Sequence, residues 1–236
     1  MAQLALLRHG QSEWNLEDRF TGWWDVDLTP LGETEARSAG RLLKTTEIPF
    51  SRAYSSVQKR AIRTLWLALE EMDQVWLPVI KDYRLNERHY GALTGLNKAE
   101  TASKHGTDQV KVWRRSFDVP PPELHDGSDY DLRSDRRYTD VRVPRTESLK
   151  TTLERVLPYW TEEIAPRLKG GENIMIAAHG NSLRAIVKHL FGVSDAEITE
   201  VEIPTGNPLL IDLSPELEVR SARYLDAARS KPLPRA

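Results

Sequence analysis

The chain has 236 residues, of which 39% are hydrophobic and 29% are charged, and its formal net charge is −2. This composition is typical of a folded globular protein, and the charge balance provides no global basic field for nucleic acid. The sequence contains no cysteine, which excludes disulfides, zinc–thiolate sites and thiol catalysis. No apolar run approaches the roughly 20 residues that span a bilayer, and there is no signal-peptide pattern, so we expect a cytoplasmic protein with no membrane partner.

Two apolar runs end in a histidine followed by a glycine. Residues 4–7 lead into Arg8-His9-Gly10, and residues 174–178 lead into His179-Gly180-Asn181. Each run is typical of a short buried strand, and ligands bind at the carboxyl ends of strands in open α/β sheets. We therefore expect both imidazoles in one pocket, with Gly10 allowing close backbone approach to a ligand.

Further helices and strands alternate along the chain. We expect a helix after Thr29-Pro30, with Leu31, Ala39, Leu42 and Leu43 on one face, and a second helix from Ser55 or Ser56 to about Met72. A short helix is expected after an Asn97 cap. Two more are expected over 149–164, with a kink at Pro158, and after Gly180. We expect strands at 53–55, 75–80, 208–213 and 217–225. This order predicts an α/β three-layer sandwich, with a mostly parallel mixed sheet flanked by helices on both faces.

We expect one domain over residues 1–236. Residues 123–145 are charged, mixed in sign and poor in apolar residues, which predicts a surface excursion at about 118–146. Residues from about 226 are predicted to form a mobile tail. We expect Trp66 and Trp76 to be packed, within the chain or at a subunit contact.

Cationic side chains and hydrogen-bond donors recur in the segments that loops can bring to one edge of the sheet. They are Arg8, His9, Asn15, Arg60, Arg88, Lys98, Arg114, Arg115, His179 and Asn181, with Glu87 as the one carboxylate. Lys98 lies in the first turn of a predicted helix, where a cation is unfavourable unless an anion binds nearby. Such a set suits a multiply charged anion, and phosphate best matches arginine's fork geometry.

A histidine surrounded by guanidiniums has a lowered pKa, so its unprotonated nitrogen can attack phosphorus and form a phosphohistidine. Arg8, Arg60 and His179 are candidates for stabilising the transferring phosphoryl group, and Glu87 is the candidate proton shuttle. The alternative is that each histidine is only a satisfied polar residue. His89 has either a packing or a binding role, whereas His105, His125 and His189 receive none. The sequence has no metal-ligand motif.

Several longer motifs resemble one known family. They are Arg8-His9-Gly10-Gln11-Ser12-Glu13-Trp14-Asn15, Phe20-Thr21-Gly22-Trp23, Lys59-Arg60-Ala61, residues 85–91, Trp113-Arg114-Arg115, residues 178–182 and Ile203-Pro204-Thr205-Gly206. Arg-His-Gly alone is typical of the histidine phosphatase superfamily. Together, the motifs resemble the 2,3-bisphosphoglycerate-dependent phosphoglycerate mutases. The resemblance runs from about residue 4 to residue 213.

The resemblance implies a role for each matching residue. His9 is the expected phosphorylated nucleophile, Glu87 the general acid/base, and Arg8, Arg60 and His179 the groups that hold the transferring phosphoryl group. The implied binding residues are Arg8, His9, Gly10, Gln11, Ser12, Glu13, Trp14, Asn15, Thr21, Gly22, Arg60, Glu87, Arg88, His89, Tyr90, Lys98, Arg114, Arg115, Gly180 and Asn181. Asn207 departs from the family pattern, which has an aliphatic residue there, and residues 123–145 match it poorly.

The implied activity is interconversion of 2- and 3-phosphoglycerate in glycolysis and gluconeogenesis, primed by 2,3-bisphosphoglycerate and without metal. The implied partners are small phosphorylated metabolites and other copies of the chain, in a homodimer or homotetramer. Two alternatives remain open at this point: a phosphatase of the same superfamily acting on small phosphorylated metabolites, and a non-catalytic binder of anionic metabolites.

Overall fold

The computed structural model describes residues 1–233, and its centre is a six-stranded mixed sheet. The strands are β1 (Ala2–Arg8), β2 (Phe50–Ser55), β3 (Val79–Lys81), β4 (Asn173–Ala178), β5 (Leu209–Leu213) and β6 (Val219–Tyr224), in the order β3-β2-β4-β1-β5-β6. β1, β2, β3 and β4 run parallel, whereas β5 and β6 pair antiparallel at the other side. This arrangement confirms the predicted mostly parallel mixed sheet.

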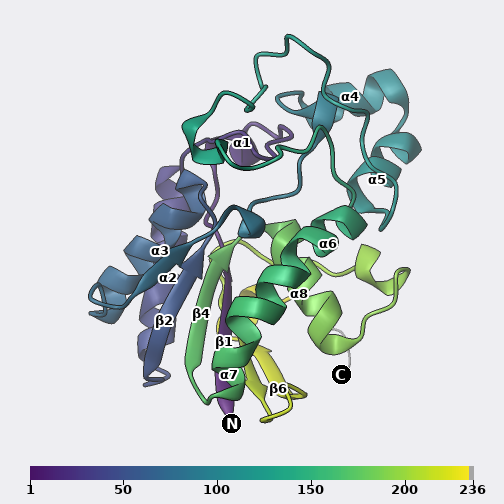
Figure 1. The fold of residues 1–236 in the computed structure, drawn as a ribbon. Coiled ribbons are helices and arrows are strands. Elements are labelled where there is room, and N and C mark those ends of the chain that lie inside the picture. The colour runs from purple at the N-terminus through teal and green to yellow at the C-terminus, as the bar shows by residue number, and fades with distance from the viewer. Residues whose placement is uncertain (234–236) are drawn as a thin grey trace.

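Helices cover both faces of the sheet (Figure 1). α2 (Pro30–Lys44) and α3 (Lys59–Met72) pack on one face, where Ala39, Leu43 and Leu65 meet the strands. α6 (Leu149–Tyr159), α7 (Ala165–Lys169) and α8 (Gly180–Phe191) cover the other face, which holds the larger core. The three-layer sandwich predicted from the sequence is therefore confirmed.

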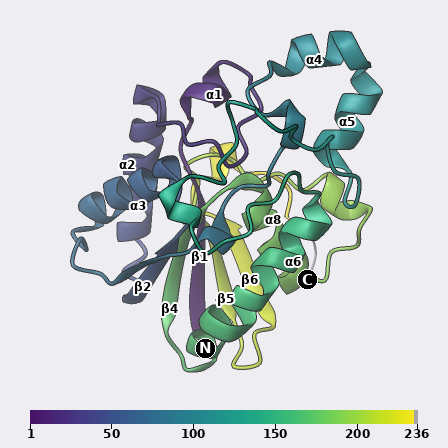
Figure 2. The ribbon, with the colours of Figure 1, turned by 45° about the horizontal axis from the view of Figure 1, so that its top comes forward.

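The carboxyl ends of the parallel strands carry the shorter elements. α1 (Glu13–Leu16), α4 (Lys98–His105), α5 (Thr107–Arg115) and residues 116–148 gather beyond that end of the sheet (Figures 1 and 2). Asn97 caps α4 as predicted, because its side chain accepts a hydrogen bond from the Glu100 amide. This end of the molecule is where both histidines emerge. In residues 1–233, no helix combines the length and the apolar character needed to cross a membrane.

Element boundaries differ from the predictions where turns intervene. The strand predicted at 75–80 begins only at Val79, since residues 74–77 form a turn in which the Leu77 amide donates to the Gln74 carbonyl. β3 does lie at the sheet edge, as Pro78 indicated. The helix predicted from Ser55 or Ser56 begins at Lys59, and the residue at its N-cap is Gln58.

The predicted packing of Leu31 is wrong, and for Trp66 and Trp76 the subunit contact stays a prediction. Leu31 is 54% exposed because α2 places Gly32 against the Gly10-Gln11 turn after β1, and one residue along a helix turns the side chain by about 100°. Trp66 and Trp76 are 52% and 71% exposed, so neither is packed within the chain. The helix at 149–164 is confirmed. A π-helical turn over Trp160–Ile164 begins two residues after Pro158, where a proline removes a backbone donor.

The excursion and the tail are more tightly attached than their sequences indicate. Leu132 and Tyr138 of the excursion are buried against Trp23, so this segment is not merely a surface feature. The start of the tail forms a 3₁₀ turn, and Arg229 donates to the Thr205 and Gly206 carbonyls. The part of the predicted mobile tail at 234–236 lies outside the described residues.

Asn207, the departure from the family pattern, fastens the tail to the sheet. Its side-chain amide donates to the Asp226 carbonyl at 2.9 Å and its side-chain oxygen accepts from the Asp226 amide at 3.0 Å. The side chain is fully buried, and this reciprocal pair satisfies both of its polar atoms. An aliphatic residue at 207 would leave the Asp226 backbone without these partners.

Candidate active site

The two histidines meet at one edge of the sheet. β1 and β4 are parallel neighbours with Arg8 opposite Ala178, so His9 and His179 each follow their strand at the same level. The His9 amide continues the ladder by donating to the Ala178 carbonyl at 3.0 Å. The two ring centroids lie 5.0 Å apart, as the paired strand-histidine-glycine motifs predict.

Hydrogen bonds select one tautomer of His9. Its Nδ1 lies 2.7 Å from the Gly10 carbonyl oxygen, which can only accept, so Nδ1 carries the proton. Nε2 faces the Arg60 Nε, a donor, at 3.4 Å. The free electron pair therefore lies on Nε2, the nitrogen available to attack an electrophile.

Burial and positive charge both keep these rings neutral. Burial is the larger cause that lowers the pKa of His9 well below 6.5, and the charges of Arg60 and Arg8 lower it further. The pKa of His179 is lowered in the same way, first by burial and then by Arg60. The guanidiniums that the sequence indicated are thus the second cause of the shift.

A cavity of about 250 Å³ opens beside His9. Of the predicted residues, its wall includes Arg8, His9, Asn15, Thr21, Gly22, Arg60, Glu87, Tyr90, Lys98, Arg114, Arg115, Gly180 and Asn181. Seven lining side chains are arginine or lysine, whereas Glu87 and Glu202 are the only carboxylates in this wall of described residues. The excess of cations suits a small ligand with several negative charges.

Five buried or half-buried arginines around the cavity have no carboxylate partner. Arg8, Arg60, Arg88, Arg114 and Arg184 form no salt bridge within residues 1–233. Burial lowers the pKa of Arg60 to about 10 and that of Arg184 to about 10, so both still carry their charge at neutral pH. Because buried cations are costly without a counter-charge, this wall favours an anionic ligand.

The three other cations of the wall do have partners, and one of them, Arg19, lies 3.0 Å from Glu17. Lys98 Nζ lies 2.9 Å from Asp18 and Arg115 lies 2.6 Å from Glu202. Asp18 and Glu202 are 58% and 44% exposed, so both pairs lie toward solvent. The Asp18 carboxylate belongs to the chain itself, so the anionic ligand indicated by the position of Lys98 in α4 stays a prediction.

Glu87 lines the same cavity as His9 and lies on the 3₁₀-rich loop after β3. Its Oε1 accepts from the amides of Arg88 at 2.8 Å and Asn181 at 3.1 Å. The Glu87 amide itself donates to the Gln58 side chain at 2.8 Å. Gly180 lies between Glu87 and Arg8, and a Cβ there would approach their side chains to 3.7 and 3.6 Å. The carboxylate is therefore held in a fixed position with one oxygen left for a ligand.

Several predicted binding residues lie behind the cavity wall. Gly10 approaches the backbone of Gly32 in α2, because a Cβ would lie 2.1 Å from the Gly32 carbonyl oxygen, so this glycine serves strand–helix packing. Gln11, Ser12, Glu13 and Trp14 form the turn into α1, which Ser12 caps. His179 lies behind His9 and hydrogen-bonds to Ser56 at 2.7 Å.

The two other predicted binding residues outside the cavity wall are Arg88, which packs against Tyr90, and His89, the next residue in the same loop. Arg88 is fully buried, with its guanidinium 4.7 Å from the Tyr90 ring centroid. Burial is the largest influence on the pKa of Tyr90 and raises it, but the Arg88 charge together with hydrogen bonds to Arg88 and Asn181 makes the net shift downward. His89 accepts from the Gly91 amide at Nδ1 and contacts Trp23, so its position in the structure is a packing one.

The sequence analysis missed several lining residues, including Arg19, Arg184 and residues 201–204. Arg184 is 5% exposed and donates to the Asn181 side chain at 3.0 Å. Its position three residues after Asn181 on α8 would have indicated a shared helix face. Glu202 carries no comparable signal, because only the folded chain brings it to Arg115.

The family comparisons agree with this geometry. The model of the histidine phosphatase superfamily (branch 1) matches residues 4–136 and 127–218. The chain belongs to the histidine phosphatase superfamily. Among solved structures, a mycobacterial glucosyl-3-phosphoglycerate phosphatase in complex with VO₃ matches with a TM-score of 0.71 and 23% identity, covering 95% of this chain and 97% of that one. At this identity the match shows the fold alone.

Curated relatives narrow the assignment. A 2,3-bisphosphoglycerate-dependent phosphoglycerate mutase of Hyphomonas neptunium is 66% identical over 234 residues, covering 99% of both chains. One of Sphingopyxis alaskensis is 60% identical over 225 residues, covering 95% of this chain and 99% of the relative. Within the superfamily, the chain groups with the 2,3-bisphosphoglycerate-dependent phosphoglycerate mutases, as its motifs predict.

Proposed function

We propose that the protein interconverts 2-phosphoglycerate and 3-phosphoglycerate through a phosphohistidine at His9. The observation that carries this proposal is the neutral His9 Nε2 at the wall of a small, strongly cationic cavity. The relatives that share 58–66% identity over nearly the whole chain bear the name of this mutase, which supports the mutase over the phosphatase.

In the proposed reaction, the His9 Nε2 electron pair forms a bond to phosphorus while the bond from phosphorus to the substrate oxygen breaks. Glu87 gives a proton to the departing oxygen and takes one back in the reverse step. Arg8, Arg60 and His179 stabilise the transferring phosphoryl group, mainly through charge and position. The position of Arg60 is fixed by hydrogen bonds to the Gly22 and Trp24 carbonyls.

The opposite wall of the cavity binds the remainder of the substrate. Lys98, Arg114 and Arg115, with Tyr90 and Asn181, are the proposed partners of its carboxylate and its second phosphate. A cofactor with phosphate at both ends fits this wall, because cations line both the His9 side and the α4–α5 side. 2,3-Bisphosphoglycerate would supply the priming phosphoryl group, and no metal takes part in the proposed reaction.

A direct assay tests the proposal. The protein is incubated with 3-phosphoglycerate, catalytic 2,3-bisphosphoglycerate and a chelator, and 2-phosphoglycerate is followed by ³¹P NMR. We expect isomerisation that is insensitive to the chelator and is lost in His9→Ala. Failure to form 2-phosphoglycerate with or without chelator, or release of phosphate faster than isomerisation, would falsify the mutase assignment.

We also propose that the chain acts as one cytoplasmic domain in a homodimer or homotetramer, with the excursion and tail as parts of it. The exposed Trp66 and Trp76, beside the edge strand β3, support self-association, since large aromatic side chains are enriched at subunit contacts. Small phosphorylated metabolites are the expected ligands, and the balanced net charge gives no support to a nucleic-acid partner.

A further inference from the structure

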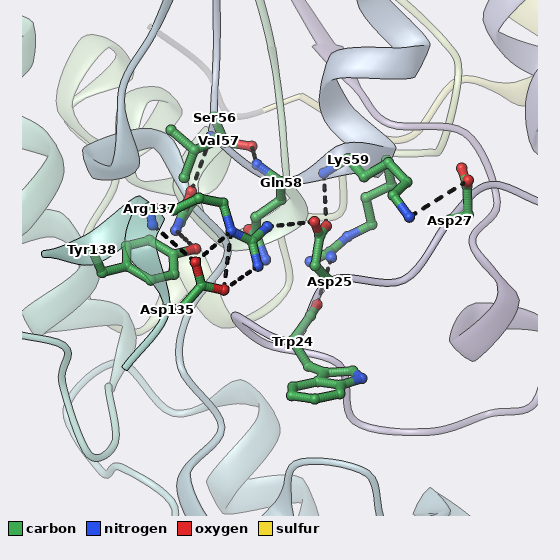
Figure 3. Close-up of polar contacts among 12 residues, drawn as sticks. Trp24, Asp25, Asp27, Ser56, Val57, Gln58, Lys59, Asp135, Arg137 and Tyr138 are labelled. Carbon is green, nitrogen blue, oxygen red and sulfur yellow. Dashed lines mark hydrogen bonds and ion pairs between the residues drawn. The ribbon is translucent and has the colours of Figure 1, made fainter. Parts of the chain in front are cut away.

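One turn of the excursion reaches toward the active site. This turn, η3 (Arg136–Tyr138), is capped by Asp135, whose carboxylate accepts from the Arg137 amide at 2.9 Å. The Arg137 guanidinium then bridges two carboxylates, those of Asp135 and Asp25 (Figure 3). Asp25 belongs to the loop between α1 and α2, more than 100 residues earlier in the sequence. η3 is thus joined by charge to a distant loop at the cavity end of the sheet.

The start of α3 depends on residues outside the helix. Gln58 occupies the N-cap position but makes no side-chain capping bond. Instead, the Lys59 amide donates to Asp25 at 2.7 Å, and the Val57 amide donates to the Asn86 side chain at 3.2 Å. Amides at a helix start have no partner within the helix, and a carboxylate there also interacts favourably with the helix dipole.

Both external partners are themselves held by η3. Arg137 pairs with Asp25, as Figure 3 shows. The Tyr138 hydroxyl accepts from the Asn86 side-chain amide at 3.0 Å, and the Tyr138 ring lies 5.0 Å from that of Trp23. Side chains of two adjacent residues therefore hold the two groups that satisfy the backbone at the start of α3.

The start of α3 carries the groups that surround the nucleophile. Arg60, the second residue of α3, donates to the Trp24 carbonyl at 3.0 Å and approaches His9 at 3.4 Å. Trp24 directly precedes Asp25, so the same loop receives both Arg60 and Arg137. Ser56, just before the helix, hydrogen-bonds to His179 at 2.7 Å. Any movement of this segment changes the position of Arg60 relative to His9.

We propose that Arg137 and Tyr138 are positioning residues for Arg60. They act through Asp25 and Asn86 and touch no reacting atom. The inference rests on the proposed function, because that function assigns Arg60 to the transferring phosphoryl group. It gives the excursion, which carries no residue of the cavity wall, a part in the reaction.

The excursion contains its own control. Asp131-x-Arg133 repeats the local geometry of Asp135-x-Arg137, since the Arg133 amide donates to Asp131 at 3.0 Å and its guanidinium pairs with the same carboxylate. Arg133 otherwise pairs only with Asp126, within the excursion, in residues 1–233. Arg133→Ala therefore removes the same kind of arginine–aspartate pair without touching Asp25.

The experiment compares Arg137→Ala and Tyr138→Phe with Arg133→Ala. Vanadate binding, measured by calorimetry, reports the pocket for the transferring group, and kcat and KM for 3-phosphoglycerate report turnover and the rest of the substrate site. We expect Arg137→Ala and Tyr138→Phe to lower kcat and weaken vanadate binding about tenfold, since small displacements of positioning groups are costly. We expect KM to stay within about twofold of the value for the unmodified protein. We expect Arg137→Lys to restore part of the kcat and vanadate binding that Arg137→Ala loses.

Values for Arg137→Ala and Tyr138→Phe that match those of Arg133→Ala would overturn the proposal, as would a rise in KM with kcat and vanadate binding unchanged. Circular dichroism checks folding, and Tyr138→Phe with Arg137→Lys decides the matter if Arg137→Ala does not fold. If the unmodified protein binds vanadate but forms no 2-phosphoglycerate, the proposed function fails, while the vanadate comparison still decides the positioning role.

Discussion

His89 shows how one buried side chain links stability to pH. It is 2% exposed, and burial lowers its pKa to about 4, although the Glu147 charge opposes this shift; the Arg155 charge adds a smaller lowering. In the unfolded chain the same imidazole titrates at about 6.5. Between these two values the unfolded state binds a proton that the folded state does not, so the stability present above pH 6.5 is lost as the pH falls toward 4.

We therefore predict that, as the pH decreases, the free energy of unfolding of His89→Gln decreases less steeply than that of the unmodified protein. The difference in slope between pH 6.5 and 4 is expected to be up to about 1.4 kcal/mol per pH unit. Urea unfolding at several pH values measures it, with His105→Gln, at the exposed end of α4, as the matched control. Identical slopes for His89→Gln and the unmodified protein would contradict the prediction.

At this scale, the sequence identified the residues that carry charge and follow a strand. Arg8, His9 and Glu87 were recognisable because residue type and position agreed with the chemistry. Arg184 and Glu202 were not, since their approach to the cavity depends on packing of α8 and the 201–204 segment. Gly10 was assigned to the ligand, although it packs on Gly32, because a glycine in sequence does not reveal which neighbour comes close.

Among the elements, α6 stabilises the loop that carries Glu87. Arg155 on α6 donates to the Arg84 carbonyl at 2.8 Å and the Glu87 carbonyl at 3.2 Å, and it pairs with Glu147 at 2.7 Å. Glu147 in turn accepts from the His89 amide at 2.8 Å. The ion pair is almost fully buried, so its two charges depend on each other.

We predict that Arg155→Met destabilises the protein by about 3–5 kcal/mol, because it leaves a buried carboxylate unpaired. The double variant Arg155→Met, Glu147→Met is expected to lose less than the single variant. Chemical denaturation provides both values. Arg37→Met, which breaks the surface pairs with Glu70 and Glu71, is the control and should cost at most about 1 kcal/mol. Equal losses of stability for Arg155→Met and Arg37→Met would contradict the stabilising role of the buried Arg155–Glu147 pair.

Helices and strands were predictable wherever the hydrophobic periodicity agreed with the capping and turn residues at their ends. Thr29-Pro30 and Asn97 marked helix starts, and both cap as expected. α3 was placed correctly at its end but not at its start, since its capping groups come from Asp25 and Asn86 rather than from a nearby serine. A distant cap leaves no local signal in the sequence.

For the molecule as a whole, the exposed edge of the sheet leads to a prediction about association. Trp76 is 71% exposed beside β3, an edge strand with unpaired backbone groups on its outer side. We expect the protein to sediment as a dimer or tetramer and Trp76→Asp to shift it toward monomers. Val119→Asp, at another exposed apolar residue, is the control. A species distribution that Trp76→Asp leaves unchanged would argue against this edge as the contact.

The fold class was predictable because strands and helices alternate and two strand-histidine-glycine segments require a common sheet edge. The packing of the excursion was not predictable. Leu132 and Tyr138 lie among many charged residues, yet both are buried against Trp23. The composition of residues 123–145 reflects the neighbours of Leu132 and Tyr138 in the sequence, so it does not predict their contact with the distant Trp23.

The position of β1 in the sheet also affects when the protein becomes competent during synthesis. β1 is made before the other strands of the sheet, and its partners β4 and β5 are made more than 160 positions later. Such distant pairings form late, because a long loop must close first. A nascent chain that stops before β4 therefore has neither sheet partner of β1, and it also lacks the second imidazole, so the edge at which the two rings meet cannot form.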